Sequence, residues 1–280
     1  MKLPNIVVRI LAGAVFVALL IGGMIINEIT YLVLFCLITG LALNEFYGLI
    51  QKSARAGLPK ILGIASGIVL VCSFFLHFFL CFSLGFYVYI LLFLVIFINE
   101  LYRKRENPLK SLAYIVLGQI YIALPFSLAA YLIFWEAPGI YSYTLLLAVF
   151  VFIWVNDSFA YLTGLTFGKH RLFERISPKK SWEGFIGGAV FATASSYLFY
   201  HFAGILPLPV WIGFALVVVA FGTWGDLVES LMKRTLGVKD SGNTIPGHGG
   251  LLDRFDSTIL AIPAIVVYLK AFAYISRIFL

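Results

Sequence analysis

Two acidic residues lie close together in the stretch FGTWGDLVESLMKR, near the end of a long apolar segment. Asp226 and Glu229 share a helix face with Ser230 and Lys233, because residues three, four and seven positions apart point to the same side of a helix. Ionisable residues in an apolar segment of membrane length are costly, so such a face contacts protein or water. A structural alternative is that the two carboxylates only pair with Lys233 and Arg234 and stabilise the helix end.

Two further carboxylates follow at the entrance to the next apolar segment. Asp253 and Asp256 are three residues apart at this entrance. If the two segments are neighbours, these side chains converge with Asp226 and Glu229. Clustered carboxylates repel one another unless cations neutralise them, and hard oxygen ligands suit Mg²⁺. The spacing therefore predicts a divalent-metal site.

A glycine-rich run, KDSGNTIPGHGGLLDRFD at 239–256, leads into the same segment. Gly247, Gly249 and Gly250 permit close backbone approach, so successive N–H groups can bind an anion just ahead of a helix N-terminus. Cationic side chains surround the run: Lys233, Arg234, Lys239 and Arg254. Metal-binding acids beside phosphate-binding bases indicate phosphoryl or nucleotidyl transfer. The competing interpretation is a flexible polar loop.

An upstream polar stretch, GKHRLFERISPKKSWEGFIGG, supplies further candidates. Ser177 precedes a proline, and Lys179 and Lys180 are candidate phosphate ligands. Asp157 lies inside the apolar segment 141–165, either as a further metal ligand or as a residue that orients a lysine. A basic loop beside a membrane can also simply follow the positive-inside rule or contact anionic lipid headgroups.

The composition indicates that the candidate residues belong to a membrane protein. The chain is 62% hydrophobic and 12% charged, with a mean hydropathy of +1.01, outside the range of soluble domains. Long apolar runs indicate helices and not a barrel. We expect an all-α polytopic membrane bundle of about nine transmembrane helices: 6–26, 30–50, 61–81, 84–100, 111–134, 141–165, 185–204, 208–232 and 257–276. The net charge of +7 does not indicate a nucleic-acid partner, because no soluble basic stripe accompanies it.

The cationic residues predict the orientation. Of 20 Lys and Arg residues, 18 fall on one side of the predicted spans, which the positive-inside rule makes cytoplasmic, together with the N-terminus. Residues 1–135 are then N-terminal transmembrane helices for scaffold, dimer contacts and lipid access. Residues 136–280 form a catalytic half with cytosolic loops at 168–184 and 233–256.

An ordered motif in this catalytic half resembles the phosphatidate cytidylyltransferase family, also called CDP-diacylglycerol synthases. The matching positions are Ser230, Lys233-Arg234, Lys239-Asp240, Gly242, Ile245-Pro246, His248-Gly249-Gly250, Asp253-Arg254 and Asp256. A second stretch is also similar: Asn156-Asp157, Ala160-Tyr161, Gly164, Gly168-Lys169 and 177–184, with Ser181 where threonine is more usual. The motif-bearing resemblance covers about residues 150–260.

The resemblance implies that CTP and phosphatidic acid react to give CDP-diacylglycerol and pyrophosphate at the cytosolic face, catalysed by a homodimer. It also implies Mg²⁺ and a second, potassium-type cation (K⁺), held by the acids at Asp226, Asp253 and Asp256. With these acids, Lys239 and Arg254 are expected to be catalytic. The expected substrate-binding residues are Asp157, Ser177, Lys179, Lys180, Lys233, Arg234, His248, Gly249 and Gly250. For His248, a phosphate contact or a loop-organising role is favoured over a base.

Two other functions fit parts of the pattern. A CTP-dependent polyprenol or dolichol kinase uses the same metal and phosphate chemistry. A transporter places acids at mid-membrane on broken helices, although here the charged face gathers at one membrane side. The expected location is an integral membrane protein of the bacterial inner membrane.

Overall fold

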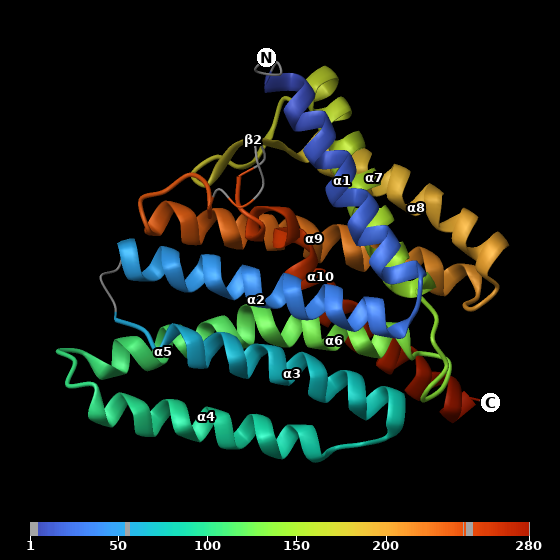
Figure 1. Cartoon of the computed structure of the whole chain (residues 1–280). Coiled ribbons are helices and arrows are strands. Elements are labelled where there is room, and N and C mark those ends of the chain that lie inside the picture. The colour runs from blue at the N-terminus through green and yellow to red at the C-terminus, as the bar shows by residue number, and fades with distance from the viewer. Residues whose placement is uncertain (1–4, 54–56, 243, 245–248, 280) are drawn as a thin grey trace. The chain divides into compact units, whose positions relative to one another are not determined.

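The protein is a bundle of long helices (Figure 1). The computed structural model describes residues 5–53, 57–242, 244 and 249–279. The chain divides into two compact units, and each unit is described separately below. The first unit comprises Met1–Tyr143 and Thr235–Phe255, and the second comprises Thr144–Arg234 and Asp256–Leu280. The expected all-α membrane bundle is confirmed.

Seven of the described helical segments are long and apolar enough to cross a bilayer. They are α2 (Glu28–Ser53), α3 (Lys60–Leu80), α4 (Leu84–Tyr102), the continuous segment Pro108–Ile133, α7 (Thr144–Phe167), α9 (Leu208–Thr235) and α10 (Leu252–Phe279). Two more helices match expected spans but fall outside this set: α1 (Asn5–Ile25), with a shorter apolar stretch, and α8 (Trp182–Ala203). The expected number of nine spans and the cytoplasmic N-terminus stay predictions.

In the first unit, α2, α3 and α4 run side by side, and α1 contacts α2 (Figure 1). The segment Pro108–Ile133 consists of α5 (Pro108–Gly118), a π-helical turn η1 (Gln119–Ala123) and α6 (Leu124–Ile133). Asn107 caps its start by accepting a hydrogen bond from the Lys110 N–H (2.9 Å), and Pro108 occupies the first turn, where no N–H is needed.

A buried polar network ties three helices of this unit together. The Gln119 side-chain amide in η1 donates to the Tyr47 hydroxyl (3.0 Å) and to the Gly63 carbonyl (2.7 Å). The Tyr47 hydroxyl in turn donates to the Ile115 carbonyl (3.1 Å). Because π-turns release backbone groups from the regular ladder, side-chain hydrogen bonds are expected beside them. The network fixes the end of α2 against α3 and α5.

The second unit packs α7 against α8 and joins them through a two-stranded hairpin, β1 (Arg171–Phe173) and β2 (Ser177–Ser181). The rings of Phe159 and Phe191 stack between the two helices. Helix α9 is fixed to α10, because the Tyr268 hydroxyl donates to the Val210 carbonyl (3.0 Å). Phe152 of α7 contacts Trp211 of α9 edge to face.

The structure corrects two expectations about the polar loops. The expected loop at 168–184 contains the β1–β2 hairpin, because short strands can close on a turn without an apolar alternation. The expected loop at 233–256 is shorter: α9 continues to Thr235 and α10 begins at Leu252. Asp253 and Asp256 therefore lie in the first turns of α10, and Lys233 lies in α9 on the helix face that its spacing predicted. The segment between these helices, residues 236–251, is called the α9–α10 loop below.

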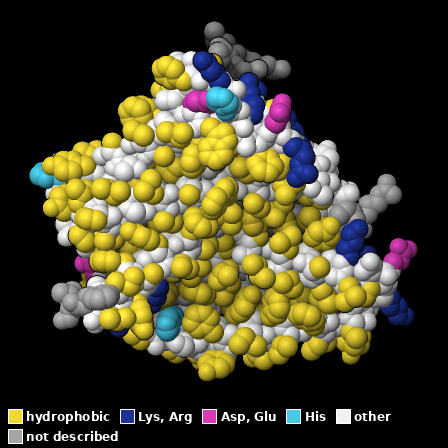
Figure 2. Space-filling view, turned by 180° about the vertical axis from the view of Figure 1, so that it is seen from behind, with side chains coloured by type: hydrophobic (Ala, Val, Ile, Leu, Met, Phe, Trp, Pro, Cys, Tyr) yellow, Lys and Arg dark blue, Asp and Glu magenta, His cyan; other side chains and the backbone are white. Residues whose placement is uncertain are grey.

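Hydrophobic side chains cover most of the face that Figure 2 displays, and charged side chains are few on it. Many large apolar residues are accordingly exposed, among them Leu19, Ile61, Leu91 and Leu165. An exposed apolar surface of this extent is unstable in water and is matched by lipid. The protein is an integral membrane protein.

Candidate functional site

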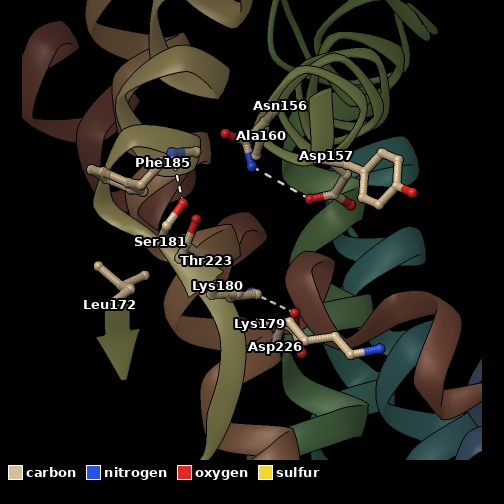
Figure 3. Close-up of a pocket in the computed structure, with 12 residues that line it drawn as sticks. Asn156, Asp157, Ala160, Leu172, Lys179, Lys180, Ser181, Phe185, Thr223 and Asp226 are labelled. Atoms are coloured by element: carbon tan, nitrogen blue, oxygen red, sulfur yellow. Dashed lines mark hydrogen bonds and ion pairs between the residues drawn. The ribbon is translucent and has the colours of Figure 1, made fainter. Parts of the chain in front are cut away.

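A cavity of about 290 Å³ lies within the second unit (Figure 3). Its wall combines apolar and aromatic side chains with acidic, basic and hydroxyl groups from α7, the hairpin, α8 and α9. The lining residues are Asn156, Asp157, Ala160, Tyr161, Leu172, Lys179, Lys180, Ser181, Gly184, Phe185, Thr223 and Asp226. A mainly apolar pocket with a few convergent polar groups is typical of ligand sites.

Opposite charges meet in this cavity. The Lys180 ammonium on β2 forms an ion pair with Asp226 on α9, and the two side chains are 29% and 30% exposed (Figure 3). The other Asp226 oxygen accepts a hydrogen bond from the Ser230 hydroxyl (3.2 Å). Because both charges remain reachable from the cavity, an incoming anion can compete with Asp226 for Lys180.

Asp157 and its neighbour Asn156 lie on the α7 wall of the cavity. The Asn156 amide donates to Asp157 Oδ1 (3.4 Å), as Figure 3 shows. The buried Asn156 Oδ1 has no hydrogen-bond partner within the described part of the chain. This oxygen faces Gly188 of α8, where an added Cβ would clash with it.

The hairpin carries Lys179 and Lys180 into the cavity, and its ends are fixed by hydrogen bonds. The Ser181 hydroxyl caps α8 by accepting from the Gly184 N–H (3.1 Å). At the exposed side, Glu183 accepts from the N–H groups of Lys169 and His170 (3.2 Å each) and contacts His170 Nδ1 (2.6 Å).

These contacts change the acidity of Glu183. Its own backbone N–H, then the His170 imidazole and the N–H groups of His170 and Lys169, lower the pKa of Glu183 from 4.5 to about 2. Each of these groups donates to the ionised form of the carboxylate. Glu183 therefore stays ionised at neutral pH and closes the base of the hairpin.

The two acidic helices of the second unit approach closely beside the cavity. A Cβ on Gly225 of α9 would lie 3.1 Å from the Ser257 Cα and closer still to the Asp256 carbonyl of α10. Gly225 precedes Asp226 in sequence, so this close approach brings the backbones at Asp226 and Asp256 together. The Asp256 side chain accepts from the Ser257 N–H (2.5 Å).

Glu229 differs from Asp226 although both were expected on one metal-binding face. Its side chain is 2% exposed and forms an ion pair with Lys233 (2.8 Å), one helical turn along α9. The structural alternative of a helix-end ion pair therefore holds for Glu229, whereas Asp226 pairs with a lysine from the hairpin instead. Lys233, expected to bind substrate, has Glu229 as a partner.

In the first unit, Asp253 organises the α9–α10 loop. Its carboxylate accepts hydrogen bonds from the Ser241 N–H (3.0 Å) and the Gly250 N–H (3.0 Å). Gly249, between these points, has φ +84°, which favours glycine over any side-chain-bearing residue. Arg254 follows in the first turn of α10.

Sequence reasoning missed Glu45, which also contacts this loop. Glu45 lies on α2 and is buried, and its carboxylate accepts from the Leu251 and Leu252 N–H groups (2.9 Å each). An acidic residue within an expected span is itself a signal of function, and that rule would have selected Glu45. Thr223 on the cavity wall has no such signal, since buried threonines are common.

The expected site residues thus divide between the units. Asp157, Lys179, Lys180 and Asp226 line one cavity, and Asp256 lies next to its α9 wall. Ser177 begins β2 and Arg234 lies in the last turn of α9. In the first unit are Lys239, Gly249, Gly250, Asp253 and Arg254. Gly247 and His248 lie outside the described residues, as do Ile245 and Pro246 of the motif.

Metal binding stays a prediction. Over residues 5–53, 57–242, 244 and 249–279, no group of three or more His, Cys, Asp or Glu side chains is gathered for a metal ion. Two of the three expected ligands, Asp226 and Asp256, belong to the second unit, and Asp253 belongs to the first.

Residues 7–272 match the cytidylyltransferase family. The chain belongs to this family. The match spans nearly the whole sequence and includes the helices of both units. Membership in the family is consistent with the paired acidic and basic groups of the cavity.

Individual relatives match over shorter stretches. A phosphatidate cytidylyltransferase of Haemophilus influenzae is 47% identical over 124 residues, which is 42% of this chain and 43% of that protein. The Bacillus subtilis protein of the same name is 40% identical over 173 residues, covering 61% and 62%. The Thermotoga maritima protein of that name is 42% identical over 130 residues, covering 44% and 48%. The chain therefore matches less than two thirds of the length of each of these relatives.

Proposed function

We propose that the protein transfers the cytidylyl group of CTP to phosphatidic acid, giving CDP-diacylglycerol and pyrophosphate for phospholipid synthesis. The observation that carries this proposal is the cavity in which Lys180 and Asp226 pair beside Asp157 and Lys179, within a membrane-embedded unit. Its charges suit phosphates, and its surroundings suit a lipid substrate. Three similar proteins, each named phosphatidate cytidylyltransferase, support the same reaction.

In the proposed reaction, a phosphate oxygen of phosphatidic acid attacks the α-phosphorus of CTP. The bond from the α-phosphorus to the bridging oxygen breaks, and pyrophosphate leaves with that oxygen. A phosphate monoester has a second pKa of about 6, so the nucleophile is ionised without a strong base. The work of the protein is then positioning and charge neutralisation.

Lys179 and Lys180 are the proposed phosphate ligands of the cavity. When a phosphate arrives, Lys180 exchanges its contact with Asp226 for the substrate, which releases the Asp226 carboxylate. Asp157 on the α7 wall orients the lysine ammonium groups. Lys239 and Arg254 of the first unit are proposed to bind the remaining phosphate charge, together with Arg234, Ser177 and the Gly249–Gly250 backbone.

Mg²⁺ is the proposed cofactor, because carboxylate oxygens are the ligands that this ion prefers. Asp226, Asp253 and Asp256 are the proposed ligands, with K⁺ as a second cation. When bound, Mg²⁺ supplies charge neutralisation at the transferring and departing phosphates.

We further propose that the protein is a homodimer of the bacterial inner membrane with its site at the cytosolic face. The distribution of Lys and Arg along the sequence supports this orientation. Phosphatidic acid enters sideways from the bilayer, since the exposed Tyr161 and the half-buried Phe185 both line the cavity.

The test uses purified protein, phosphatidic acid and CTP labelled at the α-phosphate. Label in the lipid fraction, with release of unlabelled pyrophosphate, supports cytidylyl transfer. A lipid kinase of the polyprenol or dolichol type would leave the label in CDP. Movement of a substrate across vesicles without turnover would favour a transporter and overturn the proposal.

A further inference from the structure

A buried carboxylate from the N-terminal half lies directly against the α9–α10 loop. Glu45 of α2 is 9% exposed. Its Oε1 accepts from the Leu251 N–H and its Oε2 from the Leu252 N–H, both at 2.9 Å. The hydroxyls of Ser241 (3.4 Å) and Thr244 also donate to it. One side chain thus accepts from three residues of the loop and from the first residue of α10.

The position of these donors explains why a carboxylate is used. Helix α10 begins at Leu252, and the first N–H groups of a helix have no partner within it. Negative charge at this end is stabilised by the helix dipole. Such a cap usually comes from the residue preceding the helix. Here it comes from a different helix, so α2 fixes where α10 begins.

The loop sequence is shaped around Glu45. A Cβ on Gly242 would lie 2.7 Å from Glu45 Oε1, and a Cβ on Gly250 would lie 2.8 Å from Oε2. A side chain at Gly242 would press on the carboxylate, and one at Gly250 would press first on the Ser241 hydroxyl and the Gly242 N, and then on the carboxylate. Both glycines are therefore required for contact with Glu45, whatever they also contribute to phosphate binding.

Helix α2, which carries Glu45, is held in place by hydrogen bonds close to that residue. Two residues further along α2, Tyr47 is held by Gln119 and the Ile115 carbonyl. The first turn of α10 is anchored beside it, because Phe255 is fully buried with its ring against Phe16 (5.7 Å) and Phe126 (5.4 Å). Both sides of the contact between Glu45 and the start of α10 are therefore held by buried side chains.

We propose that Glu45 is a positioning residue for the transfer reaction. Through the backbone at Leu251 and Leu252 it orients the first turn of α10, and with it Asp253 and Arg254. Glu45 does not contact substrate. This inference rests on the proposed function, in which Asp253 and Arg254 bind cations and phosphate.

The test compares Glu45→Gln with Glu45→Asp in the full-length protein. Glutamine keeps the size but turns an N–H₂ group toward the N–H donors, so we expect kcat/KM for CTP to fall roughly 10- to 100-fold. We also expect the Mg²⁺ concentration for half-maximal transfer to rise. Aspartate keeps the charge and should recover part of both losses. A purely structural role would lower the folded yield and leave the Mg²⁺ requirement of the folded protein unchanged.

The matched control is Glu100→Gln. Glu100 is a buried carboxylate of the same unit, 4% exposed, on α4, where it pairs with Arg103 (3.4 Å) and not with the loop. We expect its kinetics to match the wild type. Equal kinetic losses in Glu45→Gln and Glu100→Gln would overturn the inference.

Amide hydrogen exchange provides a readout that needs no activity. The Leu251 and Leu252 amides should exchange slowly in the wild type and Glu100→Gln, and at least 10-fold faster in Glu45→Gln. Unchanged exchange in Glu45→Gln, or in Glu45→Asp if the glutamine variant does not fold, would show that Glu45 does not hold the Leu251 and Leu252 N–H groups. Absence of label transfer by the wild-type protein would instead reject the proposed function. Faster exchange in Glu45→Gln would still show that Glu45 holds the two N–H groups.

Discussion

The α9–α10 loop and the cavity of the second unit both gather carboxylates, but they use them differently. In the loop, Glu45 and Asp253 accept hydrogen bonds from backbone N–H groups. In the cavity, Asp226 pairs with the side chain of Lys180 and stays partly exposed. Hydrogen bonds from backbone N–H groups hold a carboxylate in one arrangement, whereas a lysine side chain can leave its carboxylate for a ligand. The hydrogen bonds at the loop fix its position, and the ion pair in the cavity can exchange its partner for a charged ligand.

The largest expected effect comes from the cavity carboxylate, Asp226. Asp226→Asn keeps the shape but removes the charge that is proposed to hold the cation, so we expect kcat to fall about 1,000-fold, or about 4 kcal/mol. The assay is transfer of α-labelled phosphate to lipid. The control is Glu174→Gln, an exposed acid of the same unit. A loss below about 10-fold in Asp226→Asn would remove Asp226 from the site.

Lys180→Met should have the next largest effect. It removes a phosphate ligand and leaves Asp226 without its cationic partner, so we expect kcat/KM for CTP to fall about 100-fold. Arg175→Met, at an exposed position of the same hairpin, should change it less than about 3-fold. Similar kinetics for the two variants would show that hairpin charge acts only through general attraction.

A glycine pair tests whether close approach of α9 and α10 holds the cavity wall. Gly225→Ala introduces a methyl group against the Asp256 and Ser257 backbone, so we expect the free energy of unfolding to fall about 1–3 kcal/mol. Gly22→Ala in α1 meets nothing within 4 Å and should gain about 0.5–1 kcal/mol from the helix preference of alanine. Thermal unfolding in detergent measures both, and a neutral Gly225→Ala would contradict the packing.

The smallest expected effect concerns the exposed base of the hairpin. The pKa of Glu183 is lowered to about 2, so its hydrogen bonds stabilise the hairpin fully above pH 4.5 and are lost as the pH falls toward 2. We expect the Lys169 and His170 amides to lose protection over this range, after correction for intrinsic exchange. In Glu183→Gln the dependence should vanish, and its persistence there would assign it to another acid.

The sequence predicted the helices well because membrane spans depend on apolar length alone. Each expected span lies on an observed helix, and the segment 111–134 corresponds to α5, η1 and α6. The errors lie at polar ends. Asp253 and Asp256 were expected before or at a helix start, whereas α10 includes both, because charged residues are favourable in a first turn when backbone N–H groups point to them.

The sequence selected several residues that line the cavity. Asp157, Lys180 and Asp226 were selected by their charge within or beside apolar segments, and the structure brings them to one cavity. The hairpin was missed because its strands carry no alternating apolar pattern. Glu45 lies within the expected span 30–50, so its charge alone could have selected it, but its partners about 200 residues away are brought to it only by the fold.

Equilibrium binding of CTP to the purified protein, without lipid substrate, tests the central claim most directly. We predict Mg²⁺-dependent binding that weakens at least 10-fold in Asp226→Asn and in Lys180→Met, and that is unchanged in Glu174→Gln. Tight binding of CTP by both cavity variants, equal to that of the wild type, would contradict the account.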